Sequence, residues 1–330
     1  MMGEPFLQVR DLKVHFPVRM GGVVFGQYAK LKAVDGISFD LKAGETLGVV
    51  GESGCGKSTL GRAVLQLLPA TGGTVSWLGC DLTQQDKNEI KKCRQELQIV
   101  FQDPLASLDP RMTAGDIIAE PLRNYFPSMP SSERKAKVAA MMDKVGLLPT
   151  MINRYPHEFS GGQCQRIGIA RAMILNPKLV ICDEPVSALD VSIRAQVINL
   201  LMDLQRDFNL SLIFISHDLA VVRHISHRVM VLYLGKVMEL AERESLYRSP
   251  RHPYTQALMS AVPIPDPDKE RAKPRVILVG DPPSPLKPPS GCVFRTRCPR
   301  ADETCARDMP QLESAAGNHN HEVACHHWRT

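Results

Sequence analysis

Residues 51–59 have the sequence GESGCGKST, and this stretch decides the fold of the 330-residue chain. It matches the phosphate-loop pattern G-x-x-x-x-G-K-[S/T] and lies between an apolar strand pattern at residues 46–50 and a helical pattern that follows. Glycines let consecutive backbone N–H groups turn inward as an anion nest, and the helix N-terminus adds its positive dipole. The sequence therefore predicts an α/β fold built around a phosphate-binding loop.

The chemistry of this loop assigns roles to its residues. Lys57 is predicted to reach the β- and γ-phosphates of a nucleotide, and the Ser58 hydroxyl to ligate Mg²⁺. The rest of the loop completes the predicted ATP-binding set: Gly51, Glu52, Ser53, Gly54, Cys55, Gly56 and Thr59. The strand–loop–helix context argues against a chance glycine-rich turn.

A second motif, KLVICDEP at residues 178–185, supplies carboxylates. Its apolar strand ends in Asp183, which is predicted to stand beside the metal ion. Glu184 follows directly and is predicted to polarise the attacking water as a general base. Because a strand-end acidic pair alone is common, this prediction depends on the phosphate loop.

The rest of the chain indicates how these motifs are arranged. Strand patterns dominate up to residue 50, helical patterns dominate from about 86 to 175, and apolar strands return at 178–185 and 210–218. Strands that alternate with helices are typical of a parallel sheet with right-handed crossovers.

The composition changes near Val262. The segment to Pro289 is dense in proline, so it predicts an extended linker or wrapping arm rather than packed helix. The sequence therefore predicts a nucleotide-binding domain at residues 1–261, with a helical subdomain at about 86–175, and a C-terminal extension at 262–330.

Four further motifs give a family resemblance. FSGGQCQRIGIARAM at 159–173 resembles the signature of ABC ATPases, SALD at 187–190 their D-loop, and ISHD at 215–218 their switch histidine motif. IVFQDP at 99–104 resembles their Q-loop. With the first two motifs, these follow the family order over residues 1 to about 240. The resemblance implies an ABC-type P-loop ATPase: a RecA-like core, an antiparallel β subdomain and an α-helical subdomain.

The resemblance also implies how hydrolysis would proceed. Glu184 would be the general base, and His217 would hold the γ-phosphate and position the water. Gln102 would contact Mg²⁺ and report nucleotide occupancy to the helical subdomain. The metal ion would then be held by Ser58, Gln102 and Asp183.

In this family the signature acts across a dimer. It would bind the γ-phosphate of ATP held by the opposite subunit, so two ATP molecules would lie between two subunits. The signature residues are Ser160, Gly161, Gly162 and Gln163, the D-loop contributes Asp190, and Phe16 is predicted to stack on adenine, with Tyr28 a weaker candidate. Phe159 stands where the family commonly has leucine, and Cys164 where a polar residue is common.

One branch of the family is especially similar. FQDPLASLDPRM (101–112), RHPYTQALMSAVP (251–263) and the tail PPSPLKPPSGCVFRTRCP (282–299) resemble ATP-binding subunits of dipeptide and oligopeptide ABC importers, the F-type subunit best of all. This implies a second ATPase subunit forming a heterodimer, two integral permeases contacted by roughly residues 104–122, an indirectly coupled extracytoplasmic peptide-binding protein, and a peripheral location on the cytoplasmic face of the cell membrane.

Other functions remain open at this point. Nickel, glutathione or another small solute would use a closely similar ATPase. ABC ATPases of DNA repair or translation typically carry coiled coils, a second cassette or basic arms, and none is found in this sequence. A purely structural partner is disfavoured by the intact Lys57, Glu184 and His217.

Composition supports this interpretation. A net charge of +5 with interleaved acidic and basic residues does not indicate a nucleic-acid partner. The N-terminus lacks the apolar region of a signal peptide, and the apolar stretches are too short to span a bilayer. Nine cysteines in a reducing compartment are expected as thiols or metal ligands, not disulfides.

Four of those cysteines form a tail motif with the spacing C-x5-C-x6-C-x19-C. They are Cys292, Cys298, Cys305 and Cys325. Four thiolates can bind Zn²⁺ or an iron–sulfur cluster, and the spacing lacks the short C-x2-C of common zinc folds. The resemblance implies a [4Fe–4S] cluster. Zinc is an alternative, because four histidines lie near the last cysteine: His319, His321, His326 and His327. Free thiols are the third possibility. Cys55, Cys80, Cys93, Cys164 and Cys182 need no role beyond packing.

Overall fold

The computed structural model describes residues 6–20, 27–263, 266–272, 276, 278, 280–315 and 318–329. The chain divides into two compact units, each made of separate stretches of sequence. The first unit contains Leu41–Thr46 and Gln84–Ser216, and the second contains Phe6–Asp40, Leu47–Thr83 and His217–Thr330. Neither unit begins or ends at residue 261, so the domain boundary predicted there stays a prediction.

A parallel sheet forms the centre of the first unit. Its strands are β6 (Leu97–Val100), β7 (Leu179–Asp183) and β8 (Ser211–Ile215), in the order β8-β7-β6. Leu179 pairs with both Leu97 and Ser211. Every residue of β7 and β8 is buried, as expected for parallel strands covered on both faces. The predicted parallel strands are confirmed.

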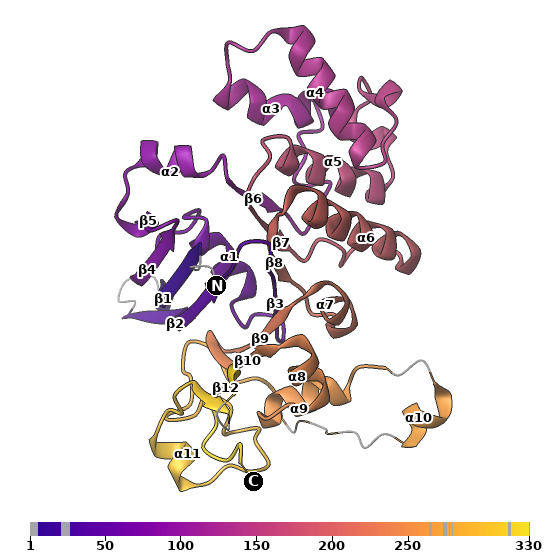
Figure 1. Cartoon of the computed structure of the whole chain (residues 1–330). Helices are drawn as coiled ribbons and strands as arrows, with labels where there is room; N and C mark the ends of the chain where they lie inside the picture. The colour runs from indigo at the N-terminus through magenta and orange to yellow at the C-terminus, as the bar shows by residue number, and fades with distance from the viewer. Residues whose placement is uncertain are drawn as a thin grey trace. The chain divides into compact units, whose positions relative to one another are not determined.

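Helices make up most of the remaining first unit (Figure 1). They are α2 (Lys87–Cys93), α3 (Ala114–Tyr125), α4 (Ser131–Lys144), α5 (Gly161–Met173) and α6 (Val191–Phe208), with short 3₁₀ turns at Pro149–Met151 and Pro156–Glu158. Asp86 begins α2 by accepting hydrogen bonds from the N–H groups of Asn88 and Glu89. No residue of α2 is buried, as expected for a helix with charged side chains on most faces.

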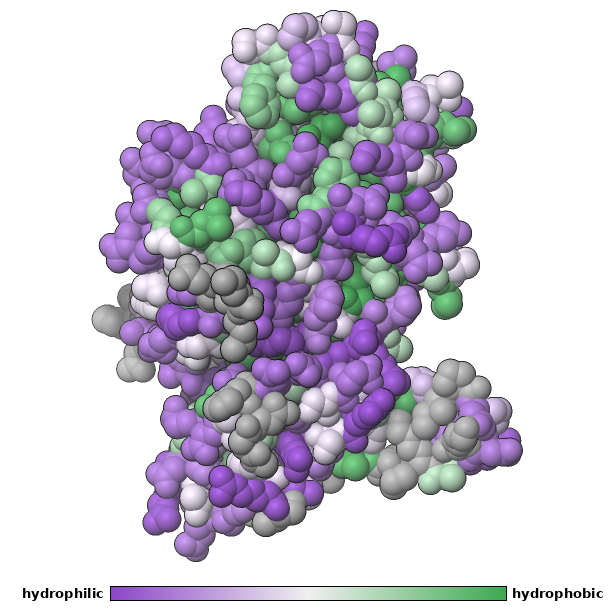
Figure 2. All heavy atoms as spheres, viewed as in Figure 1, coloured by the Kyte–Doolittle hydropathy of each residue, from purple (hydrophilic) through white to green (hydrophobic). Residues whose placement is uncertain are grey.

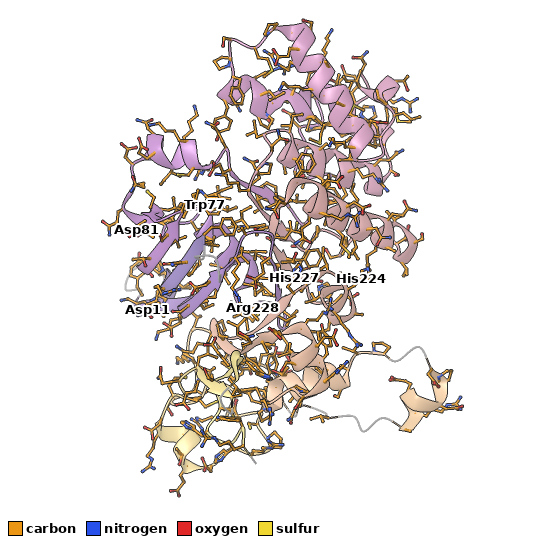
Figure 3. All side chains as sticks on the ribbon, viewed as in Figure 1. Asp11, Trp77, Asp81, His224, His227 and Arg228 are labelled. Atoms are coloured by element: carbon orange, nitrogen blue, oxygen red, sulfur yellow. The ribbon has the colours of Figure 1, made fainter. Side chains whose placement is uncertain are left out.

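An antiparallel sheet occupies the N-terminal part of the second unit. Its order is β2-β1-β4-β5, with β1 at Leu7–Met20, β2 at Gln27–Leu41, β4 at Gly72–Trp77 and β5 at Cys80–Asp81. Leu7 pairs with Trp77 at the end of β4 (Figure 3). The Trp77 ring is 2% exposed and lies 4.8 Å from the Phe6 ring, so this sheet has its own apolar core.

The second sheet of this unit carries the phosphate loop and the tail. Its order is β11-β12-β10-β9-β3, where β3 (Thr46–Val50) runs parallel to β9 (Arg228–Tyr233), and β10 (Lys236–Glu242), β11 (Glu313–Ala315) and β12 (Asn318–Val323) are antiparallel to their neighbours. The described helices of the second unit are α1 (Lys57–Val64), α7 (Leu219–Ile225), α8 (Arg243–Arg248), α9 (Pro253–Ser260), α10 (Pro267–Ala272) and α11 (Glu303–Arg307). A 3₁₀ turn at Leu82–Gln84 lies at the edge of this unit.

The tail joins this sheet through β12, which pairs with β10 at Glu239 and Val323. A small apolar cluster of Ala315, Val323 and Trp328 packs beside it. The sequence had predicted the tail as a separate extension and gave no sign of these strands. The tail is therefore part of the sheet that carries the phosphate loop.

The proline-rich segment differs from its prediction at one point. Residues 267–272 form the short helix α10, where an uninterrupted extended arm was expected. Pro267 stands at the first helical position, where its fixed φ is compatible with a helix. The carbonyl of Asp266 accepts from the N–H of Glu270, so the turn closes locally.

The surface drawn in Figure 2 is mostly hydrophilic, with apolar side chains gathered over α3 and α4. Among the described residues no helix combines the length and the apolar character that crossing a membrane requires. Leu105 and Phe126, on either side of α3, are 55% and 43% exposed. Scattered exposed apolar residues are normal for a protein surface.

Candidate functional site

The phosphate loop follows β3 and ends at Gly56, the N-cap of α1. All three of its glycines have backbone conformations that other residues rarely adopt: φ is 151° at Gly51, 77° at Gly54 and 106° at Gly56. A Cβ at Gly56 would lie 2.0 Å from the carbonyl oxygen of Ala33, and one at Gly51 would lie 2.2 Å from that of Leu232. The loop therefore requires glycine at both positions.

Lys57 is folded into this loop. Its Nζ donates to the carbonyl oxygens of Gly51 at 2.8 Å and Glu52 at 3.0 Å, and the residue is only 5% exposed. An ammonium group has three donors, so a bound phosphate would compete with these carbonyls. Ser58 and Thr59 lie in the first turn of α1, where backbone N–H groups lack intrahelical acceptors.

The side chain of Glu52 has a partner that sequence reasoning missed. Nη1 of Arg297, in the tail, donates to the two Glu52 carboxylate oxygens at 3.1 and 2.8 Å. The backbone N–H of Glu52 donates to the hydroxyl of Tyr254 at 3.0 Å. No local pattern links residues so far apart in sequence.

The carboxylates of the second motif lie at the end of β7. Asp183 is its last residue and is 2% exposed. Glu184 follows with φ 45°, a sparsely populated conformation for a non-glycine residue and one that is often found at functional sites. Its backbone is held by the Ile215 carbonyl, which accepts from its N–H at 3.0 Å, and by Ser187, whose hydroxyl donates to its carbonyl at 3.1 Å.

Gln102 reaches this carboxylate. Its Nε2 donates to Oε2 of Glu184 at 3.2 Å. Gln102 had been predicted as an Mg²⁺ ligand, and the structure places it in the same first unit as the predicted base. A hydrogen bond to the charged form of a carboxylate orients it, which suits a group that must face a water molecule.

The signature residues form the N-terminus of α5. Ser160 Oγ accepts from the Gln163 N–H at 3.3 Å, and Gln163 Oε1 accepts from the Ser160 N–H at 2.9 Å, which is a capping box. Gly161 is exposed, while a Cβ on Gly162 would lie 2.4 Å from Cγ2 of Ile193. Cys164 is buried behind them, and its thiol donates to the Pro156 carbonyl at 3.5 Å.

The remaining predicted ATP-site residues are also described. His217 is exposed after β8, and Asp190 is exposed at the N-cap of α6. Phe16 is half-buried in β1, whereas Tyr28 is 73% exposed. Their roles in binding ATP stay predictions.

The tail cysteines are gathered in space. Cys292 and Cys305 are buried, and Cys298 and Cys325 are half-buried. Burial raises the pKa of Cys292 to about 11, and the neighbouring charges of the other three tail cysteines add to the shift. Burial also raises the pKa of each of those three. The fold therefore brings the four thiols within electrostatic reach of one another.

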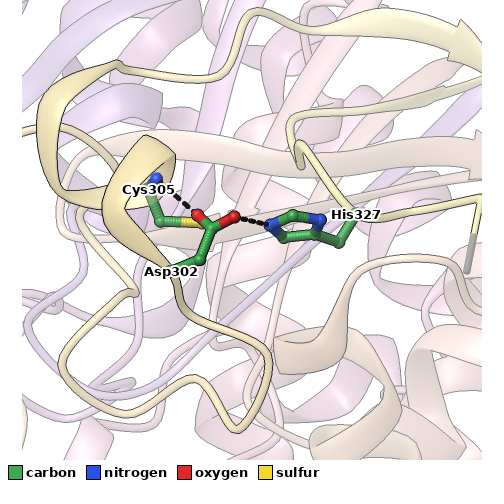
Figure 4. A group of neighbouring side chains, drawn as sticks. All are labelled: Asp302, Cys305 and His327. Atoms are coloured by element: carbon green, nitrogen blue, oxygen red, sulfur yellow. Dashed lines mark hydrogen bonds and ion pairs between the residues drawn. The ribbon is translucent and has the colours of Figure 1, made fainter.

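A second possible donor group overlaps this set (Figure 4). Potential ligand atoms of Asp302, Cys305 and His327 lie within 4.8 Å of one another. Asp302 accepts from the Cys305 N–H at 2.9 Å and faces His327 Nε2 at 3.0 Å. The hydrogen bond from the Cys305 backbone is the main reason that the pKa of Asp302 is lowered to about 2, with His327 contributing.

Two other tail histidines, His321 and His326, are engaged elsewhere. The ring nitrogens of His321 face Oε1 of Glu239 at 2.6 Å and Oγ of Ser245 at 2.7 Å. His326 Nε2 lies 3.0 Å from the carbonyl of Asp308. The side chain of His319 lies outside the described residues. Among the zinc-candidate histidines whose side chains the structure describes, His327 is placed beside Cys305.

Comparison with known families gives two matches along the chain. Residues 34–187 match the family described as ABC transporter. Residues 238–305 match the family described as oligopeptide/dipeptide transporter, C-terminal region. The second match ends at Cys305, before the last of the four tail cysteines.

Individual proteins resemble the chain over nearly its full length. The oligopeptide transport ATP-binding protein OppF of Salmonella typhimurium is 62% identical over 320 residues, covering 97% of this chain and 95% of the relative. AppF of Bacillus subtilis, also an oligopeptide transport ATP-binding protein, is 53% identical, covering 98% and 97%. Among solved structures, the dimeric post-hydrolysis state of the ATP-binding cassette MJ0796 bound to ADP and Pi has a TM-score of 0.64 at 27% identity, covering 72% of this chain and 98% of that one.

Proposed function

The chain belongs to the ABC transporter family, as an ATP-binding subunit of the oligopeptide type, and on this premise we propose that it hydrolyses ATP to drive the import of oligopeptides. The observation that carries this function is the 62% identity to an oligopeptide transport ATP-binding protein over 97% of the chain. That similarity includes the tail, which matches a region specific to oligopeptide and dipeptide transporters. The ABC ATPase fold expected from the motifs is confirmed by the family and structural matches.

The proposed chemistry assigns each site residue a role. The phosphate loop would bind the triphosphate through its backbone N–H groups and Lys57. Ser58, Gln102 and Asp183 would hold Mg²⁺, which neutralises charge on the phosphates when bound. Glu184 would take a proton from the attacking water. The hydrogen bond that Gln102 donates at 3.2 Å would orient the Glu184 carboxylate for this step.

We propose further that the signature acts on a second subunit's nucleotide. Its capping box fixes the N-terminus of α5, and a helix N-terminus is suited to bind an anion. ATP bound to one subunit's phosphate loop and the other's signature would favour a closed dimer, and hydrolysis would remove that bridge. His217 and Asp190 would complete the site, and Phe16 would stack on the adenine.

Peptide would not contact this chain in the proposed assembly. A heterodimer of this subunit and a second ATPase would dock on two integral permeases, placing the chain at the cytoplasmic face of the membrane. Residues 104–122, which include exposed Leu105, are proposed to contact the permeases. An extracytoplasmic binding protein would select the peptide.

The assembly and the solute can be tested together. We expect the tagged full-length chain, purified in mild detergent from its own cells, to bring down two permeases and a second ATPase. Removing the chain should abolish oligopeptide uptake, and restoring it should recover that uptake. Loss of nickel or glutathione uptake with intact peptide uptake would contradict the peptide assignment and favour that alternative.

We also propose that the four tail cysteines hold a metal centre, a [4Fe–4S] cluster, with Zn²⁺ as the alternative. What supports this proposal is the residue type, since four thiolates are a usual donor set for either centre, and a bound cation would stabilise the thiolates whose formation burial opposes. The cluster of Ala315, Val323 and Trp328 in the tail is small, so a bound metal would help to hold the tail folded. The Asp302 carboxylate would hold His327 beside the cysteines.

Metal analysis tests this centre. The full-length chain, purified without oxygen, should contain iron and acid-labile sulfide in equal amounts and show broad visible absorbance. Cys298→Ser should lose both iron and absorbance, whereas Cys80→Ser, at an exposed cysteine of β5, should keep them. One zinc per chain without iron would overturn the cluster and support the Zn²⁺ site instead. Absence of both metals would overturn the proposed centre.

A further inference from the structure

The contact between Arg297 and Glu52 joins the cysteine tail to the phosphate loop. The side chains are 8% and 27% exposed, so this ion pair is largely removed from solvent. Both residues belong to the second compact unit. A shielded ion pair is weakened little by salt and costs much to break on one side.

Aromatic packing fixes the position of this arginine. Phe294, three residues before it, is fully buried, and its ring centroid lies 5.3 Å from those of both Tyr233 and Tyr254. The Arg297 guanidinium lies 6.0 Å from the Tyr233 ring centroid. Tyr254 in turn accepts from the Glu52 N–H. The tail therefore holds the Glu52 side chain directly through Arg297, while Tyr254, on which the tail residue Phe294 packs, holds the Glu52 backbone.

Glu52 poses an electrostatic problem for a phosphate site. It is the second residue of the loop, and a carboxylate there would repel a triphosphate if left unpaired. The Glu52 charge also acts on the Cys55 thiol in the loop. Burial is the main cause of the raised pKa of this thiol; Glu52 raises the pKa further, whereas Lys57 lowers it. Arg297 supplies the compensating charge.

We infer that Arg297 is a positioning residue for ATP binding, which holds and neutralises the Glu52 carboxylate so that the phosphate loop accepts the triphosphate. This inference rests on the proposed function, because its effect is on ATP. Arg297 acts through Glu52, which is distant from the tail in sequence but accepts hydrogen bonds from the Arg297 side chain. The tail thereby contributes to the nucleotide site as well as to its own fold.

Arg297→Ala tests the inference in the assembled transporter. We expect KM for ATP to rise about tenfold, equivalent to ~1.4 kcal/mol, with kcat changed less than about twofold, because Glu184 is untouched. Arg297→Lys retains the charge and should recover most of the affinity. Arg295→Ala is the matched control: Arg295 lies in the same tail segment, and its Nε donates to the Ser290 carbonyl at 2.9 Å.

A second substitution separates charge from tail folding. Adding Glu52→Gln to Arg297→Ala removes the unpaired carboxylate, so KM should return toward the wild-type value. An unchanged KM in Arg297→Ala, an unrescued double variant, or an equal defect in Arg295→Ala would each overturn the inference. A wild-type transporter without ATPase activity would instead count against the proposed function.

Discussion

Replacing Glu184 with glutamine is expected to lower kcat for ATP hydrolysis by about 100-fold or more, because general-base catalysis typically contributes 10²–10⁴-fold. The change removes a proton acceptor but almost no volume. Its amide oxygen can still accept the hydrogen bond that Gln102 donates at 3.2 Å. The backbone at φ 45° is the same for both residues, so the fold should be unaffected.

The measurement is ATP turnover by the assembled transporter, with ATP binding followed in parallel. Binding should persist in Glu184→Gln, because Lys57 and the loop N–H groups are unchanged. Glu133→Gln, at an exposed position of α4, should behave as the wild type. Normal hydrolysis by Glu184→Gln would remove this residue from the catalytic role.

Replacing Lys57 with alanine should weaken ATP binding by about 100-fold, a different defect from that of Glu184→Gln. Hydrogen bonds to charged groups contribute about 1.5–3 kcal/mol each, and Lys57 has more than one to offer the phosphates. Lys57→Arg should also fail, because the buried space that holds a compact ammonium, 5% exposed here, does not suit a planar guanidinium.

Equilibrium titration of the full-length chain with ATP measures this effect, and thermal unfolding checks that each variant folds. The folding check is needed because Lys57 also holds the carbonyls of Gly51 and Glu52. Lys87→Ala, at an exposed position of α2, supplies the control and should bind ATP normally. A folded Lys57→Ala chain that keeps wild-type affinity would contradict the phosphate role.

The geometry of local motifs could be predicted from the sequence. Gly51 and Gly56 need positive φ, and Ser160 and Gln163 form a capping box within a single turn. Such features depend on residues a few positions apart, whose interactions are set by backbone geometry. The parallel strands that carry Asp183 followed from their apolar pattern for the same reason.

Other features of the site depend on contacts that no local pattern encodes. The sequence motif placed Gln102 in a Q-loop, but its hydrogen bond to Glu184 joins residues 82 positions apart. The spacing of the tail cysteines left their relation open, and the fold placed the other three near enough to Cys292 to raise the pKa of its thiol. His321 had been a zinc candidate by position, yet its ring faces Glu239 and Ser245.

The sequence by itself determined the phosphate-loop motif and the place of this chain among ABC ATPases, because the chemistry of phosphate binding requires particular residues at short, fixed spacings. Only the tertiary structure decided that the tail enters the phosphate-loop sheet as β12 and that Arg297 pairs with Glu52, 245 residues away. Strand pairing and buried ion pairs join distant segments, so they are fixed only when the whole unit has folded.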